Sequence, residues 1–71
     1  MGVRAYEFRF AGEADRTVRA AFSDFNISVG DGSTLLQARL LDQAAVHGTL
    51  DRISALGLEL IEVRSVEAPS P

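Results

Sequence analysis

Residues 25–38 read FNISVGDGSTLLQA, and this stretch decides the fold. Two runs in which apolar and polar side chains alternate flank Asp31-Gly32, and this dipeptide between such runs is typical of a two-residue hairpin turn. The length of the turn fixes the register, because it sets which residues lie opposite each other. The predicted opposite pairs are Val29 with Thr34, Ile27 with Leu36, and Phe25 with Ala38. These side chains then share one face of the sheet, so turn chemistry and apolar pattern agree.

One strand and one helix are predicted before the hairpin. Residues 3–10 alternate Tyr6, Phe8 and Phe10 with small or charged side chains, which is the period of a half-buried strand. Residues 12–24 carry apolar side chains at spacings of three and four, which predicts a helix with one apolar stripe.

A second helix and a last strand are predicted after the hairpin. Residues 42–56 form the helix, with Asp42 as its N-cap and Gly57 in the left-handed position that follows a helix end. Residues 58–66 form the strand. In this strand, Ile61 and Val63 are predicted to face the core, and Leu60 to face the other way.

The order of elements, β-α-β-β-α-β, predicts a ferredoxin-like α+β domain. We expect an antiparallel sheet of order 4-1-3-2 with both helices on one face. The domain is predicted to cover residues 1–66, with residues 67–71 as a flexible tail, because its prolines pair poorly in a sheet. The side chains expected to meet the helices are Tyr6, Phe8, Ile27, Leu36, Ala38, Ile61 and Val63. The side chains expected on the open face are Glu7, Arg9, Ser28, Leu35, Gln37, Arg39, Leu41, Leu60, Glu62 and Arg64.

Composition narrows the classes of function. A chain of 71 residues builds one apolar core and is near the lower limit for folding alone, so self-association would add useful burial. There is no cysteine, which excludes disulfides, thiolate metal sites and cysteine nucleophiles. The net charge is -3, and the seven arginines are scattered, which argues against a nucleic-acid partner. The apolar runs are too short for a membrane span, so a cytoplasmic location is expected.

His47 is the only histidine and the only imidazole available for catalysis. Asp51 follows four residues later, and the two could form an oriented acid-base pair on one helix face. A lone histidine more often lies at the boundary of a core without a catalytic task. No metal site, phosphate-binding glycine loop or serine-nucleophile motif is recognised, so we expect no metal and no cofactor.

Gly48 lies in the middle of the second predicted helix, where glycine costs about 0.5–1 kcal/mol relative to alanine. Ala44 and Ala55 share its outward side, so the three small residues could let a partner helix or a ligand approach closely. The alternative is that an exposed helix simply tolerates glycine.

The segment DQAAVHGTL, residues 42–50, resembles short bacterial proteins that read D-Q-A-A-[LV]-H-G-x-L and have no assigned function. This resemblance implies a ferredoxin-like architecture and transfers no active site. Amino-acid-binding regulatory domains of the ACT type are similar in outline, and they bind ligands at the interface of a dimer. Acylphosphatases and heavy-metal-associated domains fit less well, because their phosphate loop and Cys-x-x-Cys loop have no counterpart here.

Two functions follow from these observations. The first is a small homodimeric, non-catalytic binding, regulatory or accessory module that holds a partner protein or a small ligand at its dimer interface. The alternative is a very small enzyme, such as an isomerase or cyclase, with a cleft between subunits and His47 as acid or base. The residues predicted to line the ligand or partner interface are Leu35, Gln37, Arg39, Leu41, Leu60, Ala44, Gly48 and Ala55.

Overall fold

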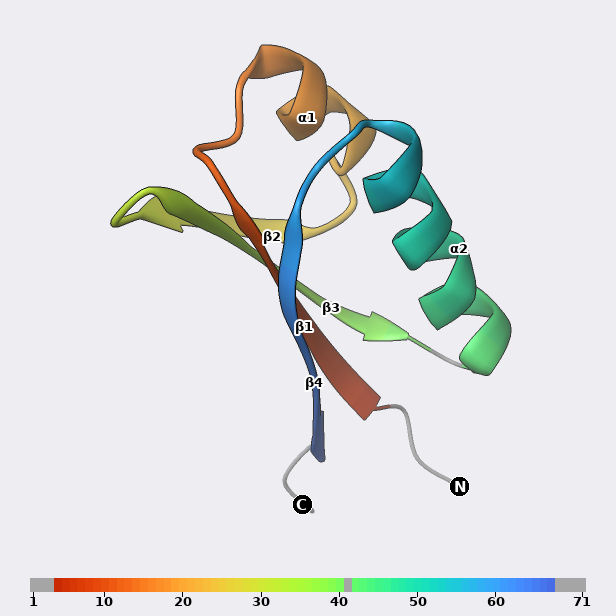
Figure 1. The fold of residues 1–71 in the computed structure, drawn as a ribbon. Helices are drawn as coiled ribbons and strands as arrows, with labels where there is room; N and C mark the ends of the chain where they lie inside the picture. Colours follow the sequence, from red (N-terminus) through yellow and green to blue (C-terminus); the bar gives the residue numbers. More distant parts are fainter. Residues whose placement is uncertain (1–3, 41, 68–71) are drawn as a thin grey trace.

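The computed structural model describes residues 4–40 and 42–67 and shows an α+β domain (Figure 1). The elements follow the predicted β-α-β-β-α-β order. They are β1 (Arg4–Ala11), α1 (Arg16–Ala21), β2 (Asn26–Gly30), β3 (Ser33–Leu40), α2 (Gln43–Ala55) and β4 (Leu60–Glu67). The predicted tail begins one residue too early, because Glu67 still belongs to β4. The rest of that tail and Leu41 lie outside the described residues.

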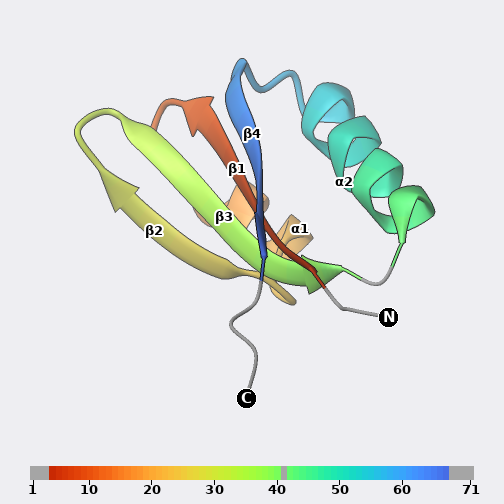
Figure 2. The same cartoon turned by 90° about the horizontal axis from the view of Figure 1, so that it is seen from below.

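The four strands form one antiparallel sheet in the order β2-β3-β1-β4. Counted from the β4 edge, this order is 4-1-3-2. The sheet is twisted, and both helices lie on the same side of it (Figure 2). The central strand β1 therefore has a partner along each edge, whereas β2 and β4 are the outer strands.

The β2–β3 hairpin turns at the predicted dipeptide. Asp31 and Gly32 both adopt positive φ angles, 55° and 73°, which a two-residue hairpin turn of this kind requires. The register confirms two of the three predicted pairs, Val29 with Thr34 and Ile27 with Leu36. Phe25 lies one residue before β2 and has no partner in its ladder.

Helix α1 is much shorter than the predicted helix over residues 12–24. Gly12 has a φ of 90°, and the helix begins only after Asp15, whose carboxylate accepts a hydrogen bond from the Val18 amide at 2.9 Å. Thr34 holds the intervening loop: its hydroxyl donates to the Gly12 carbonyl at 2.8 Å and accepts from the Ala14 amide at 2.9 Å. These bonds satisfy the backbone outside a helix, so the apolar spacing does not extend the helix toward Gly12.

Helix α2 begins and ends as predicted. The Asp42 carboxylate accepts from the Ala45 amide at 2.9 Å, and Gly57 follows the helix with a φ of 71°. The Gly57 amide donates to the Ser54 carbonyl at 2.9 Å, and the next amide, of Leu58, reaches back to a carbonyl within the helix at 3.2 Å. This pair of bonds is the Schellman arrangement, which satisfies the free carbonyls of the last turn.

The core lies between the helices and one face of the sheet. It combines aromatic side chains of β1 and of the α1–β2 segment with aliphatic side chains of β3 and both helices. Its buried members are Phe8, Phe10, Val18, Phe22, Phe25, Leu36, Val46 and Ile53. The rings of Phe22 and Phe25 meet edge to face with centroids 5.5 Å apart, a favoured aromatic geometry.

Strand β4 departs from the prediction at its start. Its register with β1 shifts between Arg9 and Phe10, so that Leu60 pairs with Phe10 while Ile61 is left without a partner in that ladder. Phe10 is a core residue, and Leu60 therefore does not belong to the open face as predicted. The bulge inserts one extra residue, which reverses the alternation of the strand before it. Ile61, predicted to be in the core, is 55% exposed for the same reason.

Candidate functional site

The sheet face opposite the helices is the first candidate surface. Leu35 and Gln37 lie on it, because they pair with Arg9 and Glu7 while the neighbouring Leu36 points into the core. Both are half-buried. Arg39, two residues further along β3, is exposed on the same face. The structure thus brings together three of the side chains predicted for this interface.

Several polar and charged side chains on this face contact one another. Gln37 donates from Nε2 to Glu7 Oε2 at 2.9 Å, and Arg64 of β4 lies 3.9 Å from the other oxygen of Glu7. Arg9 donates to the Ser33 hydroxyl at 3.1 Å. The Arg64 side chain is 59% exposed, and exposed ion pairs contribute about 0–1 kcal/mol each. These contacts hold the side chains of this face in defined positions, and they add little to the free energy of unfolding.

A shallow, open hollow of about 230 Å³ lies on this face at the hairpin end. Leu35 supplies an apolar side chain beside the Arg9 guanidinium, and hydroxyls complete the wall. The lining residues are Arg9, Ser28, Val29, Gly30, Asp31, Ser33 and Leu35. Such a mixture can hold the apolar part of a small molecule or a partner side chain while a cation and hydroxyls meet its polar part.

The outward side of α2 is the second candidate surface. Ala44, Gly48 and Ala55 are all exposed, as predicted. A Cβ atom built on Gly48 would meet no heavy atom within 4 Å, so no contact inside the subunit requires glycine there. The strip therefore remains open to solvent in the single chain.

His47 has no hydrogen-bonding or charged partner among the described residues. His47 and Asp51 are both exposed on α2, and no hydrogen bond or ion pair joins them among the described residues. The hollow on the opposite side of the sheet does not include either side chain. Within residues 4–40 and 42–67, no group of three or more histidine, aspartate or glutamate side chains could hold a metal ion.

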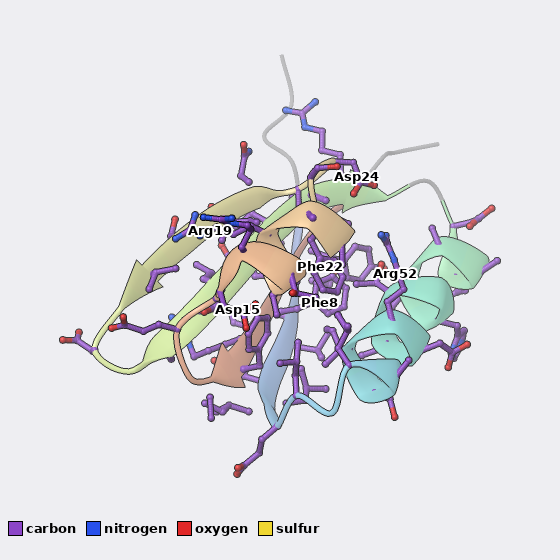
Figure 3. All side chains as sticks on the ribbon, turned by 90° about the horizontal axis from the view of Figure 1, so that it is seen from above. Phe8, Asp15, Arg19, Phe22, Asp24 and Arg52 are labelled. Atoms are coloured by element: carbon purple, nitrogen blue, oxygen red, sulfur yellow. The ribbon has the colours of Figure 1, made fainter. Side chains whose placement is uncertain are left out.

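Arg52 makes a contact between the helices that the sequence pattern does not indicate. This side chain reaches from α2 toward the end of α1 and lies over the Phe22 ring, 5.0 Å from its centroid (Figure 3). It donates to the Ala21 carbonyl at 2.8 Å and lies 3.8 Å from an Asp24 carboxylate oxygen. Nothing in the local sequence pattern indicates that a helix-surface arginine spans this distance.

The edge formed by β4 is the other feature that the sequence analysis missed. Leu60, Ile61 and Val63 are 39%, 55% and 38% exposed, and Leu56 at the end of α2 is 37% exposed. A bulge depends on how two strands pair, so alternation within one segment cannot reveal it. The described part of the chain thus carries its large exposed apolar side chains at one edge.

Comparison with known proteins gives one family match. The family model described as Domain of unknown function (DUF8691) matches residues 5–64. No curated protein and no solved structure matches the chain. In addition, neither helix of the described residues is long and apolar enough to cross a membrane.

Proposed function

We propose that this chain, which belongs to the DUF8691 family, is a small homodimeric binding, regulatory or accessory module without catalytic activity of its own. It holds a partner protein or a small ligand on the sheet face opposite the helices. A ferredoxin-like architecture is part of the proposal and is supported by the β-α-β-β-α-β order, and so is a relation to short bacterial proteins, which the segment over residues 42–50 supports. A cytoplasmic location and the absence of a nucleic-acid partner are parts of this proposal.

The uncovered sheet face carries the proposal. Leu35 is a half-buried apolar side chain in a hollow that also offers the Arg9 guanidinium and the Ser33 hydroxyl. The only imidazole of the chain, on His47, lies away from this hollow. A concave surface that combines an apolar side chain with a cation and hydroxyls suits the binding of a small molecule or a partner side chain.

The test is native mass spectrometry of the protein purified gently from its own host. We expect a mass that exceeds two chains by a retained ligand, or a complex of two chains with one partner protein. Leu35→Asp should lose the extra mass and keep the dimer, because it places a charge in the hollow. Ala44→Asp is the matched control on α2 and should keep both.

Two outcomes would contradict this proposal, the first its binding role and the second its site. One is a bare dimer from host cells in every growth condition, with no co-purifying protein. The other is retention of the ligand by Leu35→Asp at the level of the unchanged chain, which would move the site away from the sheet face.

A further inference from the structure

Strand β4 is an outer strand of the sheet that the described residues form, and its edge exposes apolar side chains. It is eight residues long, and Ile61 and Val63 expose 55% and 38% of their surface along it. Val63 pairs with Phe8 and so belongs to the helix-covered side of the sheet, yet the helices leave much of it open. An edge strand with exposed apolar side chains and free backbone groups is a template for pairing with another strand. Charged side chains and bulges are among the devices that keep such an edge single, and β4 carries both, so a second copy can pair with it only in a register that matches its charges.

We infer that two copies of the chain pair antiparallel along their β4 edges, with Val63 opposite the partner subunit's Val63. The result is one continuous sheet of eight strands, four from each copy, with all helices on one side. This inference rests on the homodimeric part of the proposed function and names the surface that forms the dimer.

The charge pattern of β4 selects this register. A two-fold axis perpendicular to the sheet keeps both helix layers on one side, and directly opposite side chains in an antiparallel pair share a face. Centring the axis on Glu62 or on Arg64 would place like charges opposite each other. Centring it on Val63 places Glu62 opposite the partner's Arg64 and Arg64 opposite the partner's Glu62.

The same register extends the charge pattern across the dimer. Within one subunit, Arg64 of β4 lies opposite Glu7 of β1, and Glu62 lies opposite Arg9. Across the seam, the row Glu7, Arg64, the partner's Glu62 and the partner's Arg9 alternates in sign over four strands. The symmetric row does the same, so each charge at the seam has opposite charges on both sides.

The other edge of the sheet lacks these features. Strand β2 has five residues, it carries no charged side chain, and Asn26 and Ser28 are exposed on it. It ends at Gly30 in the hairpin, which shortens any ladder that it could form. The apolar contact and the charge pattern that would fix a register are therefore found along β4.

The first test exploits the symmetry of the charges. In the Glu62→Arg variant, positions 62 and 64 are both arginine. In the Arg64→Glu variant, both positions are glutamate. Each variant alone should dimerise about 10-fold to 100-fold more weakly than the unchanged chain at low ionic strength, because two opposite pairs become like pairs. An equimolar mixture of the two variants should restore the dimer as a heterodimer, which sedimentation and native mass spectrometry detect.

Controls with the same changes of charge separate this effect from net charge. Glu13→Arg and Arg16→Glu change exposed side chains in the β1–α1 loop and on α1, and they should leave the dimer unchanged alone and when mixed. Failure of the Glu62→Arg and Arg64→Glu mixture to recover association would overturn the proposed register.

The second test locates the seam directly. The chain contains no cysteine, so Val63→Cys introduces a single thiol. Opposite Cα atoms in antiparallel strands lie about 4.5–5.5 Å apart, within the range that a disulfide spans. An added oxidant should therefore link two Val63→Cys chains rapidly and should leave Gly48→Cys and Leu35→Cys chains separate.

The outcomes distinguish this inference from the proposed function. Linkage through Gly48→Cys or Leu35→Cys, with none through Val63→Cys, would overturn the β4 seam and retain a homodimer. A monomer at tens of micromolar would overturn both. A monomer that binds an unrelated extended peptide along β4 would show that the edge accepts a foreign strand and would equally overturn the second copy as its occupant.

Discussion

Arg52 is a single side chain that joins the two helices. Its guanidinium lies over the Phe22 ring and donates to the Ala21 carbonyl, so it links α2 directly to the end of α1. We expect Arg52→Ala to lower the free energy of unfolding by about 1–2 kcal/mol, from the lost cation–π contact and hydrogen bond. Chemical denaturation measures this. Asp24→Ala should cost about 0.5 kcal/mol or less, because that ion pair is largely exposed. Equal costs for the two variants would mean that charge pairing, and not stacking, joins the helices.

Thr34 acts through its hydroxyl, which is fully buried and satisfies two backbone groups of the β1–α1 loop. Thr34→Val keeps the shape of the side chain and leaves the Ala14 amide and the Gly12 carbonyl without this partner. We expect a loss of about 1–3 kcal/mol in the free energy of unfolding, measured by denaturant titration.

The matched control is Thr49→Val in α2. The Thr49 hydroxyl is also buried, but it donates only to the Ala45 carbonyl one turn earlier in its own helix. Its loss should cost about 1 kcal/mol or less, because no loop depends on it. A larger effect at Thr49 than at Thr34 would contradict the role of Thr34 in holding the loop.

At the scale of elements, two glycines of the α2 region predict opposite effects. Gly48 lies inside the helix with open space around its Cα, so Gly48→Ala should raise the free energy of unfolding by about 0.5–1 kcal/mol. Gly57 follows the helix with a φ of 71°, so Gly57→Ala should lower it by about 1 kcal/mol. Thermal unfolding of both variants checks this. A destabilising Gly48→Ala would indicate that this position packs closely against another chain.

The helices and strands also show which structural features could be predicted from the sequence. The Asp31-Gly32 turn and the Asp42 cap were predicted correctly, because each depends on residues within a few positions of each other. Helix α1 was predicted too long, because the apolar spacing over residues 12–24 does not record the bonds from Thr34, twenty-two residues after Gly12. The place of Leu60 was wrong because the bulge arises only when β4 pairs with β1.

For the candidate surfaces too, local patterns predicted some residues, whereas contacts between distant elements were not predicted. Leu35 and Gln37 follow from alternation once the hairpin register is known, and both lie on the open face. Leu41 lies outside the described residues. The exposed apolar edge at Ile61 and the position of Arg52 needed the folded arrangement, because each depends on elements distant in sequence.

At the scale of the whole molecule, dimerisation should appear in the thermal stability. A domain this small gains much of its burial from association, so the melting temperature should fall on dilution. For a hundredfold dilution from tens of micromolar we expect a fall of about 5–10 °C, measured by differential scanning fluorimetry or circular dichroism. An unchanged melting temperature would contradict the homodimer.

A substitution at His47 distinguishes the binding module from the small enzyme. As an exposed helix residue, His47→Gln should change the free energy of unfolding by about 1 kcal/mol or less and leave the phenotype of the host unchanged. Growth and metabolite profiling of the host measure this. Loss of a pathway product, in cells where the variant accumulates normally and still dimerises, would instead favour the isomerase or cyclase with His47 as acid or base.

The position of β1 between β3 and β4 has a consequence for how the chain is made. The first strand of this domain to be synthesised is an inner strand of the sheet, and one of its two neighbours extends to Glu67. While residues 60–67 have not yet been synthesised, β1 can pair only with β3. The aromatic side chains of β1 then lack their neighbours on β4. Such long-range pairing slows folding, since the loop must close before the contacts form. The domain therefore completes its sheet only after β4 has been synthesised, and until then Phe8 and Phe10 lack part of the surface that covers them.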